Sequence, residues 1–247
     1  MKEREGKNEL HLTWRKWESK LAIFEGWRKK YVNPLIRAWW LYLFDVFFHE
    51  VSTLSNSAGL CLDVGCGSGS CLCRLVKEGE RTGVGLDPLK EGSLKIFKDR
   101  IKGYKISEKI ELIRGVGEYL PIKKDCVQTC ITTGVIDHVN NPNQTVKEIH
   151  RVLVSDGYFL LLESVLLKNR PSFYDETHLH HFTIVDLKRL LRQFRIQKIR
   201  KFFPVLSQLH IPDKLLDSNI YKALSKMPSV IGCYFNYSEV FIKSKKN

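Results

Sequence analysis

The stretch Leu62-Asp63-Val64-Gly65-Cys66-Gly67-Ser68-Gly69 decides the fold of this chain. Its first half is apolar at alternate positions, which predicts the end of a buried parallel strand. The alternating glycines then predict a tight turn, where no Cβ fits and the backbone can approach a ligand. Apolar residues at helical spacing follow and end at Gly79, so a helix should begin directly after the turn. Strand, turn and helix N-terminus together predict a nucleotide-type pocket at the carboxyl edge of a sheet.

The glycine spacing separates two kinds of nucleotide pocket. A dinucleotide loop needs G-x-G-x-x-G, whereas this chain has G-x-G-x-G, with Ser70 at the position of the third glycine. Asp63 stands two residues before the first glycine and should point towards the same turn. A carboxylate there repels a pyrophosphate but suits a cationic ligand, and S-adenosylmethionine is one, with its sulfonium and α-amino groups. The alternative is a tight strand–helix turn that binds nothing.

A second acid stands at the end of the next predicted strand, 82–87. Asp87 comes 18 residues after Gly69, near the spacing at which a carboxylate accepts both ribose hydroxyls of an adenosine. Asn141-Pro142 predicts the start of a helix that runs to about residue 153. Apolar and β-branched segments predict further strands at 110–116, 127–133 and 158–163. Strands that alternate with helices in this way predict a doubly wound α/β sheet.

Length and composition indicate a soluble globular protein with one substantial core. The chain has 247 residues, of which 43% are hydrophobic and 27% charged. Its longest nearly apolar run, 38–48, is interrupted by Asp45 and is too short to span a bilayer. The first residues show no apolar segment of a secretory signal. We therefore expect a cytoplasmic protein without a transmembrane segment.

Cysteine content and charge narrow the choice of partners. The seven cysteines include no pair of CxxC units, which predicts reduced thiols and no metal site.

The formal charge is +13, and residues 182–247 hold thirteen Lys/Arg against four Asp/Glu, a surplus of +9. This surplus favours acidic partners, namely nucleic acid, anionic lipid headgroups or phosphorylated substrates. A solvated basic surface without a partner explains it equally well.

Residues 1–57 precede the glycine turn and carry an unusual load of aromatic residues. Apolar positions at three- and four-residue intervals predict an amphipathic helix before Asn33-Pro34 and a second helix after it. These helices have three interpretations: a cap that shapes a substrate cavity, simple packing onto the main domain, or peripheral contact with a membrane interface.

The ordered motifs make this chain resemble the class I S-adenosylmethionine-dependent methyltransferases, especially the broad small-domain group with an LDVGCGxG first motif. The similarity runs from about Leu60 to Phe194, with matching segments in the family's order at 62–69, 85–88, 115–121, 135–139, 148–153 and 182–191. In the last segment, Thr183 and Asp186 predict a capping box at the start of a helix.

The resemblance implies a seven-stranded sheet of order 3-2-1-4-5-7-6, with strand seven antiparallel. Strand six should lie near 196–202 and strand seven at 237–243, with a helical insertion at about 203–232 between them. The cofactor domain would then span 58–247, after a helical cap at 1–57. The resemblance also implies the residues that bind S-adenosylmethionine: Asp63, Gly65, Cys66, Gly67, Gly69, Asp87, Pro88, Gly117, Glu118, Tyr119, Thr133 and Gly134.

Three positions depart from the family pattern. Val116 replaces the acid that usually accepts a hydrogen bond from the adenine amino group, which leaves the backbone and Tyr119 to hold the adenine. Gln128 replaces an acid before strand four, and Ser155-Asp156 replaces Pro-Gly before strand five. Since the acids and glycines of the pocket are intact, we expect cofactor binding to survive.

Methyl transfer to a hydroxyl also requires a base that takes its proton. Titratable residues follow strand four, as Asp137-His138, and gather again in the loop 174–181, where His178 and His181 are the preferred candidates. The histidines and acids of this loop also fit a zinc or iron site, but the family has such a loop without a metal. Histidines that only hydrogen-bond within the loop are an equal alternative.

The sequence thus predicts a methyltransferase that O-methylates a small metabolite or a lipid- or sugar-linked intermediate. One alternative is an RNA methyltransferase that uses the basic carboxyl-terminal third, for which steeply salt-dependent RNA affinity would be diagnostic. Another is a non-catalytic partner protein that keeps the fold.

Overall fold

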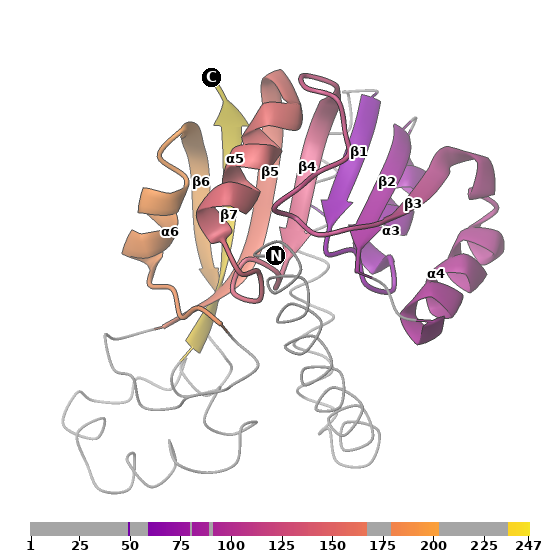
Figure 1. Cartoon of the computed structure of the whole chain (residues 1–247), viewed down its shortest axis with the longest axis horizontal. Coiled ribbons are helices and arrows are strands. Elements are labelled where there is room, and N and C mark those ends of the chain that lie inside the picture. The colour runs from indigo at the N-terminus through magenta and orange to yellow at the C-terminus, as the bar shows by residue number, and fades with distance from the viewer. Residues whose placement is uncertain (1–48, 50–58, 80, 89–90, 167–178, 203–236) are drawn as a thin grey trace, which may run out of the picture.

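Seven strands form one sheet in the order β3-β2-β1-β4-β5-β7-β6 (Figure 1). The computed structural model describes residues 49, 59–79, 81–88, 91–166, 179–202 and 237–247. The strands are β1 Gly59–Val64, β2 Arg81–Asp87, β3 Ile110–Arg114, β4 Val127–Thr133, β5 Leu153–Leu166, β6 Phe194–Phe202 and β7 Tyr237–Lys246. Neighbours are parallel except at β7, which is antiparallel to both β5 and β6. The predicted strand order and the single antiparallel strand are confirmed.

Helices cover both faces of this sheet, as a doubly wound fold requires. The described helices are α3 Ser70–Glu78, α4 Glu91–Tyr104, η1 Ser107–Lys109 (a 3-10 helix), α5 Pro142–Val152 and α6 Ile184–Leu190. In Figure 1, α5 and α6 lie in front of β5, β6 and β7, and Ile149, Leu187 and Ile242 share one apolar cluster. A second cluster joins Leu72 of α3 and Phe97 of α4 on the opposite face of β1 and β2.

Two helices begin at the predicted caps. The side-chain oxygen of Asn141 accepts a hydrogen bond from the Gln144 N–H at 3.0 Å, at the start of α5. At α6, the Thr183 hydroxyl accepts from the Asp186 N–H at 3.2 Å, while the Asp186 carboxylate accepts from the Thr183 N–H at 2.9 Å. This reciprocal pair is the capping box that the sequence predicts.

Strand β5 differs most from its prediction. It begins at Leu153, directly after α5, and not after Gly157. The β4–β5 pairing shifts register between Val127 and Thr129, and Asp156 lies within the irregular stretch at φ 64°. An irregularity of this kind depends on pairing with a distant strand, so apolar periodicity could not predict it.

Two predicted units, the helical cap at 1–57 and the insertion at 203–232, lie outside the described residues except for His49. Among the helices that the structure describes, none has the length and apolar character needed to cross a membrane.

Candidate cofactor site

The glycine turn joins β1 to α3 and is tied to the end of β2. Gly65 and Cys66 donate their backbone N–H groups to the carbonyl of Leu86, at 2.7 and 3.2 Å. A further bond of 2.7 Å, from the Gly69 N–H to the Cys66 carbonyl, closes the turn immediately before the first helical residue. Because β1 and β2 are parallel neighbours, the turn and the end of β2 meet at the carboxyl edge of the sheet.

Two glycines of this turn serve different purposes. Gly65 has φ 73°, and a Cβ there would lie 2.4 Å from Cγ2 of Val135, so close packing excludes any side chain. Gly67 has φ 49°, but a Cβ there would meet nothing within 4 Å. The backbone at Gly67 therefore borders open space, where a ligand can approach the chain closely.

Two carboxyl groups flank this open backbone. The Asp87 carboxylate accepts a hydrogen bond from the Gly67 N–H at 2.9 Å, which fixes its position against the turn. Asp63 is 1% exposed, and its Oδ1 atom has no hydrogen-bond partner. Burial, and then the nearby Asp87 charge, raise the pKa of Asp63 from 3.8 to about 8, although a backbone hydrogen bond at Leu72 lowers it.

These groups suit a cationic ligand that also carries hydroxyls. A buried acceptor oxygen without a partner is costly, and an ammonium group within hydrogen-bond distance would satisfy it and return the carboxyl to its charged form. A carboxylate can accept several hydrogen bonds, so Asp87 can hold both Gly67 and hydroxyl groups of a ligand. The geometry therefore fits the predicted S-adenosylmethionine, and it fits a pyrophosphate poorly.

Arg100, on α4, braces the outside of the glycine turn, and the sequence analysis missed it. Its Nη1 atom donates to the carbonyl of Ser68, to the Ser70 hydroxyl at 2.7 Å and to the Ser68 hydroxyl at 3.3 Å. The guanidinium thus holds both ends of the segment that passes into α3. No motif marks this arginine, because the contact depends on how α4 packs beside α3.

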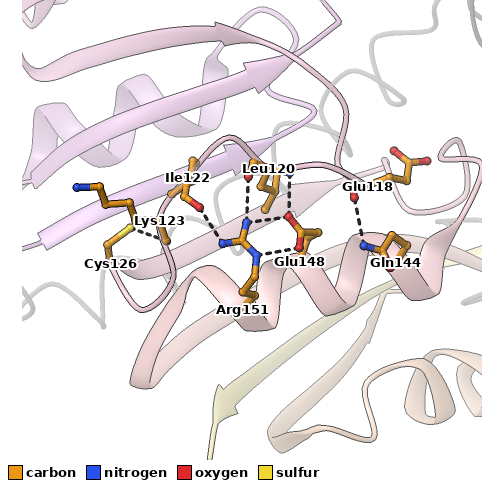
Figure 2. A network of polar contacts seen from close by, with 8 residues as sticks. All are labelled: Glu118, Leu120, Ile122, Lys123, Cys126, Gln144, Glu148 and Arg151. Carbon is orange, nitrogen blue, oxygen red and sulfur yellow. Dashed lines mark hydrogen bonds and ion pairs between the residues drawn. The ribbon is translucent and has the colours of Figure 1, made fainter. Parts of the chain in front are cut away.

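The loop after β3 is held by two residues of α5 (Figure 2). The Arg151 guanidinium donates to the carbonyls of Leu120 and Ile122, each at 2.9 Å, and forms an ion pair with Glu148 at 2.8 Å. Glu148 in turn accepts from the Leu120 N–H at 3.0 Å. The E-I-x-R segment of α5 therefore positions the loop that carries Gly117, Glu118 and Tyr119.

Within that loop, the Glu118 side chain is buried and the Tyr119 side chain is exposed. Glu118 is buried, and its Oε1 atom accepts from the N–H groups of Asn140 and Asn141, at 2.8 and 3.2 Å. Tyr119 is 73% exposed. Its ring is therefore accessible to solvent. A cofactor role for either side chain stays a prediction.

The other predicted cofactor residues lie at the same edge of the sheet. Thr133 ends β4, and Gly134 follows at φ 61°, with its N–H bonded to the Leu162 carbonyl at 2.8 Å. The Pro88 carbonyl, directly after β2, accepts from Arg114 at 3.2 Å. Gly117 lies three residues after the end of β3. Cys66 lies in the glycine turn, where burial raises the pKa of its thiol. The fold thus brings segments from four strands to one edge.

The predicted bases that the structure describes lie in the loop after β4 and in the segment before α6. Asp137 is 3% exposed, and its Oδ1 atom is 3.6 Å from Nε2 of His138. His180 connects the segment before α6 to the loop after β4. Its backbone N–H donates to the Asp137 carbonyl at 3.0 Å, and its ring nitrogen Nε2 lies 2.9 Å from the Val139 carbonyl. His181 is half-buried beside it, whereas His178 lies outside the described residues.

Glu163, in β5, holds the loop that follows β4. The sequence analysis did not predict it as a site residue. It is fully buried, and its Oε2 atom accepts from the N–H groups of Val135 and Ile136, at 3.3 and 2.9 Å. The available signal was a charged residue at the end of the apolar segment 158–163. Among the described residues, no group of three or more His, Cys, Asp or Glu side chains could hold a metal ion.

Comparison with known proteins agrees with this arrangement. Residues 62–161 match a family model described as a methyltransferase domain. The chain is 34% identical over 107 residues to a tRNA U34 carboxymethyltransferase of Marinobacter nauticus, a match that covers 43% of this chain and 31% of that protein. A demethylmenaquinone methyltransferase of Lactobacillus johnsonii is 27% identical over 58% of this chain and 52% of its own length. This chain therefore spans only part of these relatives.

The fold is also shared with solved methyltransferase structures. One is geranyl diphosphate C-methyltransferase from Streptomyces coelicolor, in complex with Mg²⁺, geranyl diphosphate and S-adenosyl-L-homocysteine. It superposes with a TM-score of 0.60 at 13% identity, over 78% of this chain and 74% of that chain.

Proposed function

We propose that this chain, in which residues 62–161 match a methyltransferase domain, belongs to the class I S-adenosylmethionine-dependent family, binds S-adenosylmethionine and transfers its methyl group to a non-protein acceptor. We further propose that the methylated atom is an oxygen of a small metabolite or of a lipid- or sugar-linked intermediate. S-adenosylmethionine is the cofactor of this family, and when bound it supplies a methyl group activated by a sulfonium.

The observation that carries the cofactor part is the pair of acids at the glycine turn. Asp63 offers a buried oxygen without a partner, and Asp87 is fixed by the N–H of Gly67, beside an open stretch of backbone. Asp63 would hold the α-amino group, and Asp87 the ribose hydroxyls. Tyr119, exposed at the rim, would stack on the adenine.

The acceptor part depends on the loops after β4 and β5. As the S–CH₃ bond breaks and the new O–CH₃ bond forms, the acceptor hydroxyl must give its proton to a base. His138 is suited to this role, because Asp137 lies 3.6 Å from its ring and stabilises the protonated imidazole. His178 and His181 are further candidates in the neighbouring loop. In either case these residues would position the acceptor and receive its proton.

A second candidate acceptor is RNA. The curated relatives include tRNA U34 carboxymethyltransferases, and residues 182–247 carry a surplus of nine positive charges. An RNA acceptor keeps the cofactor chemistry and changes only the surface that holds the substrate.

Calorimetric titration with S-adenosylmethionine tests the cofactor part. Asp87→Ala removes a charged acceptor worth about 1.5–3 kcal/mol, so Kd should rise roughly 10- to 150-fold. Asp99→Asn, on the exposed surface of α4, is the matched control and should bind like wild type. Absence of heat in a folded wild-type sample would favour the non-catalytic partner protein.

The acceptor is tested by methyl transfer from radiolabelled S-adenosylmethionine. Total RNA, a lipid extract and a small-molecule extract are offered separately, and label is counted in each after separation. Label in the small-molecule or lipid fraction supports the proposal when NMR of the purified product places the new methyl group on oxygen. Label confined to RNA replaces it with the second candidate.

A further inference from the structure

The loop that follows β4, residues 135–141, is held at both ends by buried carboxylates. At its start, Glu163 of β5 accepts hydrogen bonds from two backbone N–H groups, at 3.3 and 2.9 Å. At its end, Glu118 accepts from two more, at 2.8 and 3.2 Å. These bonds fix the entry and the exit of the loop, and His138 lies between them.

His180 attaches the middle of this loop on both sides of His138. Its backbone N–H donates to the Asp137 carbonyl at 3.0 Å, and its ring nitrogen Nε2 lies 2.9 Å from the Val139 carbonyl. A carbonyl oxygen can only accept, so this Nε2 must carry a hydrogen.

The peptide group between Asp137 and His138 is bonded at both of its polar atoms. Its carbonyl accepts from His180, and its N–H donates to the Val135 carbonyl at 3.0 Å. With the Val139 carbonyl held as well, the backbone on each side of His138 is fixed. The backbone in turn sets the direction in which the His138 side chain leaves the loop.

His180 is itself anchored to the core of the fold. Its ring stacks on the ring of Phe182, with the centroids 5.8 Å apart and an interplanar angle of 24°. Phe182 packs against the main apolar cluster, and its carbonyl accepts from the N–H of Leu166, at the end of β5, at 2.8 Å. A continuous chain of contacts therefore runs from β5 through Phe182 and His180 to His138.

We propose that His180 is a positioning residue for methyl transfer and acts through His138. This inference rests on the proposed function, in which His138 receives the hydroxyl proton as the methyl group passes from sulfur to the acceptor oxygen. A base must lie within hydrogen-bond distance of that hydroxyl, and a displacement of about 1 Å can cost about 100-fold in rate. His180 restrains the loop against such a displacement before the acceptor binds.

Two substitutions separate the hydrogen bond of His180 from its packing. His180→Phe keeps an aromatic ring against Phe182 and removes the Nε2–H donor. His180→Gln removes the ring and keeps a donor, since the amide nitrogen of glutamine takes the place of Nε2. Both variants keep the backbone bond to Asp137, so they differ in the bond to Val139.

Initial rates of methyl transfer from radiolabelled S-adenosylmethionine to the small-molecule extract test the proposal. At saturating cofactor, His180→Phe should lower the rate about 10- to 100-fold, while His180→Gln should stay within about threefold of wild type. His150→Phe is the matched control and should have the wild-type rate. His150 is also half-buried and packs against a phenylalanine, Phe194, but it lies on α5, outside this loop.

The double variant His138→Gln/His180→Phe distinguishes positioning from general support of the fold. If His180 acts through His138, its substitution should add less than about twofold to the loss that His138→Gln causes alone. Three results overturn the proposal: an additive loss in the double variant, a His180→Gln protein as slow as His180→Phe, or an equal loss in the control.

Nitrogen NMR of protein labelled on its histidines tests the hydrogen bond without an acceptor. The signals that His180→Gln removes should report the Nε2–H form, and a hydrogen on Nδ1 alone would overturn the proposal. Calorimetric titration of the His180 variants with S-adenosylmethionine should give the wild-type Kd. Label in none of the extracts would be a failure of the proposed function, whereas a wild-type rate in His180→Phe would be a failure of this inference alone.

Discussion

Replacing Asp63 by Asn should change how the stability of the free protein depends on pH. The raised pKa of Asp63 means that the folded chain favours the protonated carboxyl, whereas the unfolded chain ionises near pH 3.8. The stability that Asp63 provides is therefore complete below pH 3.8 and is lost as pH rises towards 8. Asn matches the protonated carboxyl in shape and charge, so Asp63→Asn should not show this loss.

The magnitude follows from the two pKa values. With 3.8 in the unfolded chain and about 8 in the folded chain, linkage gives a loss on the order of 3–4 kcal/mol between pH 5 and pH 8. For a chain of this length, that corresponds to roughly 10 °C in Tm. The variant should consequently gain on wild type by this amount over the same interval, because its own curve lacks the Asp63 contribution.

Urea unfolding at pH 5, 6, 7 and 8, followed by circular dichroism, measures the effect as a difference between two proteins. Asp99→Asn removes an exposed carboxyl and should run parallel to wild type. In calorimetry, Asp63→Asn should also lose at least tenfold in affinity for S-adenosylmethionine, because the charged acceptor for the ammonium is absent. Parallel pH curves for wild type and Asp63→Asn would refute the reasoning, since they would mean that Asp63 is solvated or already paired.

Three further substitutions test the parts that shape the site. Arg100→Gln should raise the Kd for S-adenosylmethionine about tenfold, because the glycine turn loses its guanidinium contacts. Lys98→Gln, two residues earlier on α4, is the control and should leave the Kd unchanged. Equal Kd values for the two variants would mean that Arg100 does not position the turn. Gly67→Ala should lower Tm by only a few degrees, since about 1 kcal/mol of backbone strain is added, yet it should abolish measurable cofactor binding. Gly65→Ala should fail to fold at 37 °C, because its Cβ would collide with Val135. A Gly67→Ala protein less stable than Gly65→Ala would contradict the assignment of open space at Gly67. Glu148→Gln should cost about 1–2 kcal/mol at pH 7 and less as pH falls, because a neighbouring arginine lowers the pKa of Glu148; a constant difference down to pH 3.5 would count against this.

Periodicity and glycine spacing predicted the fold correctly because they report local requirements. The buried strand before Gly65 needs apolar residues on both faces, which it has except at Asp63, and the turn needs residues that tolerate a positive φ. The antiparallel strand near 237–243 follows from the resemblance to a family and not from periodicity alone. Its observed extent, Tyr237–Lys246, is longer because Lys246 continues the pairing with Phe194 of β6.

Contacts between distant segments were outside the reach of the sequence. Arg100 reaches Ser68 across 32 positions, and Glu163 reaches Ile136 across 27. Both are ordinary residue types on regular elements, so only their packing shows what they support. The same applies to Glu118, whose motif suggests a ligand contact but whose carboxylate accepts two N–H groups near the start of α5.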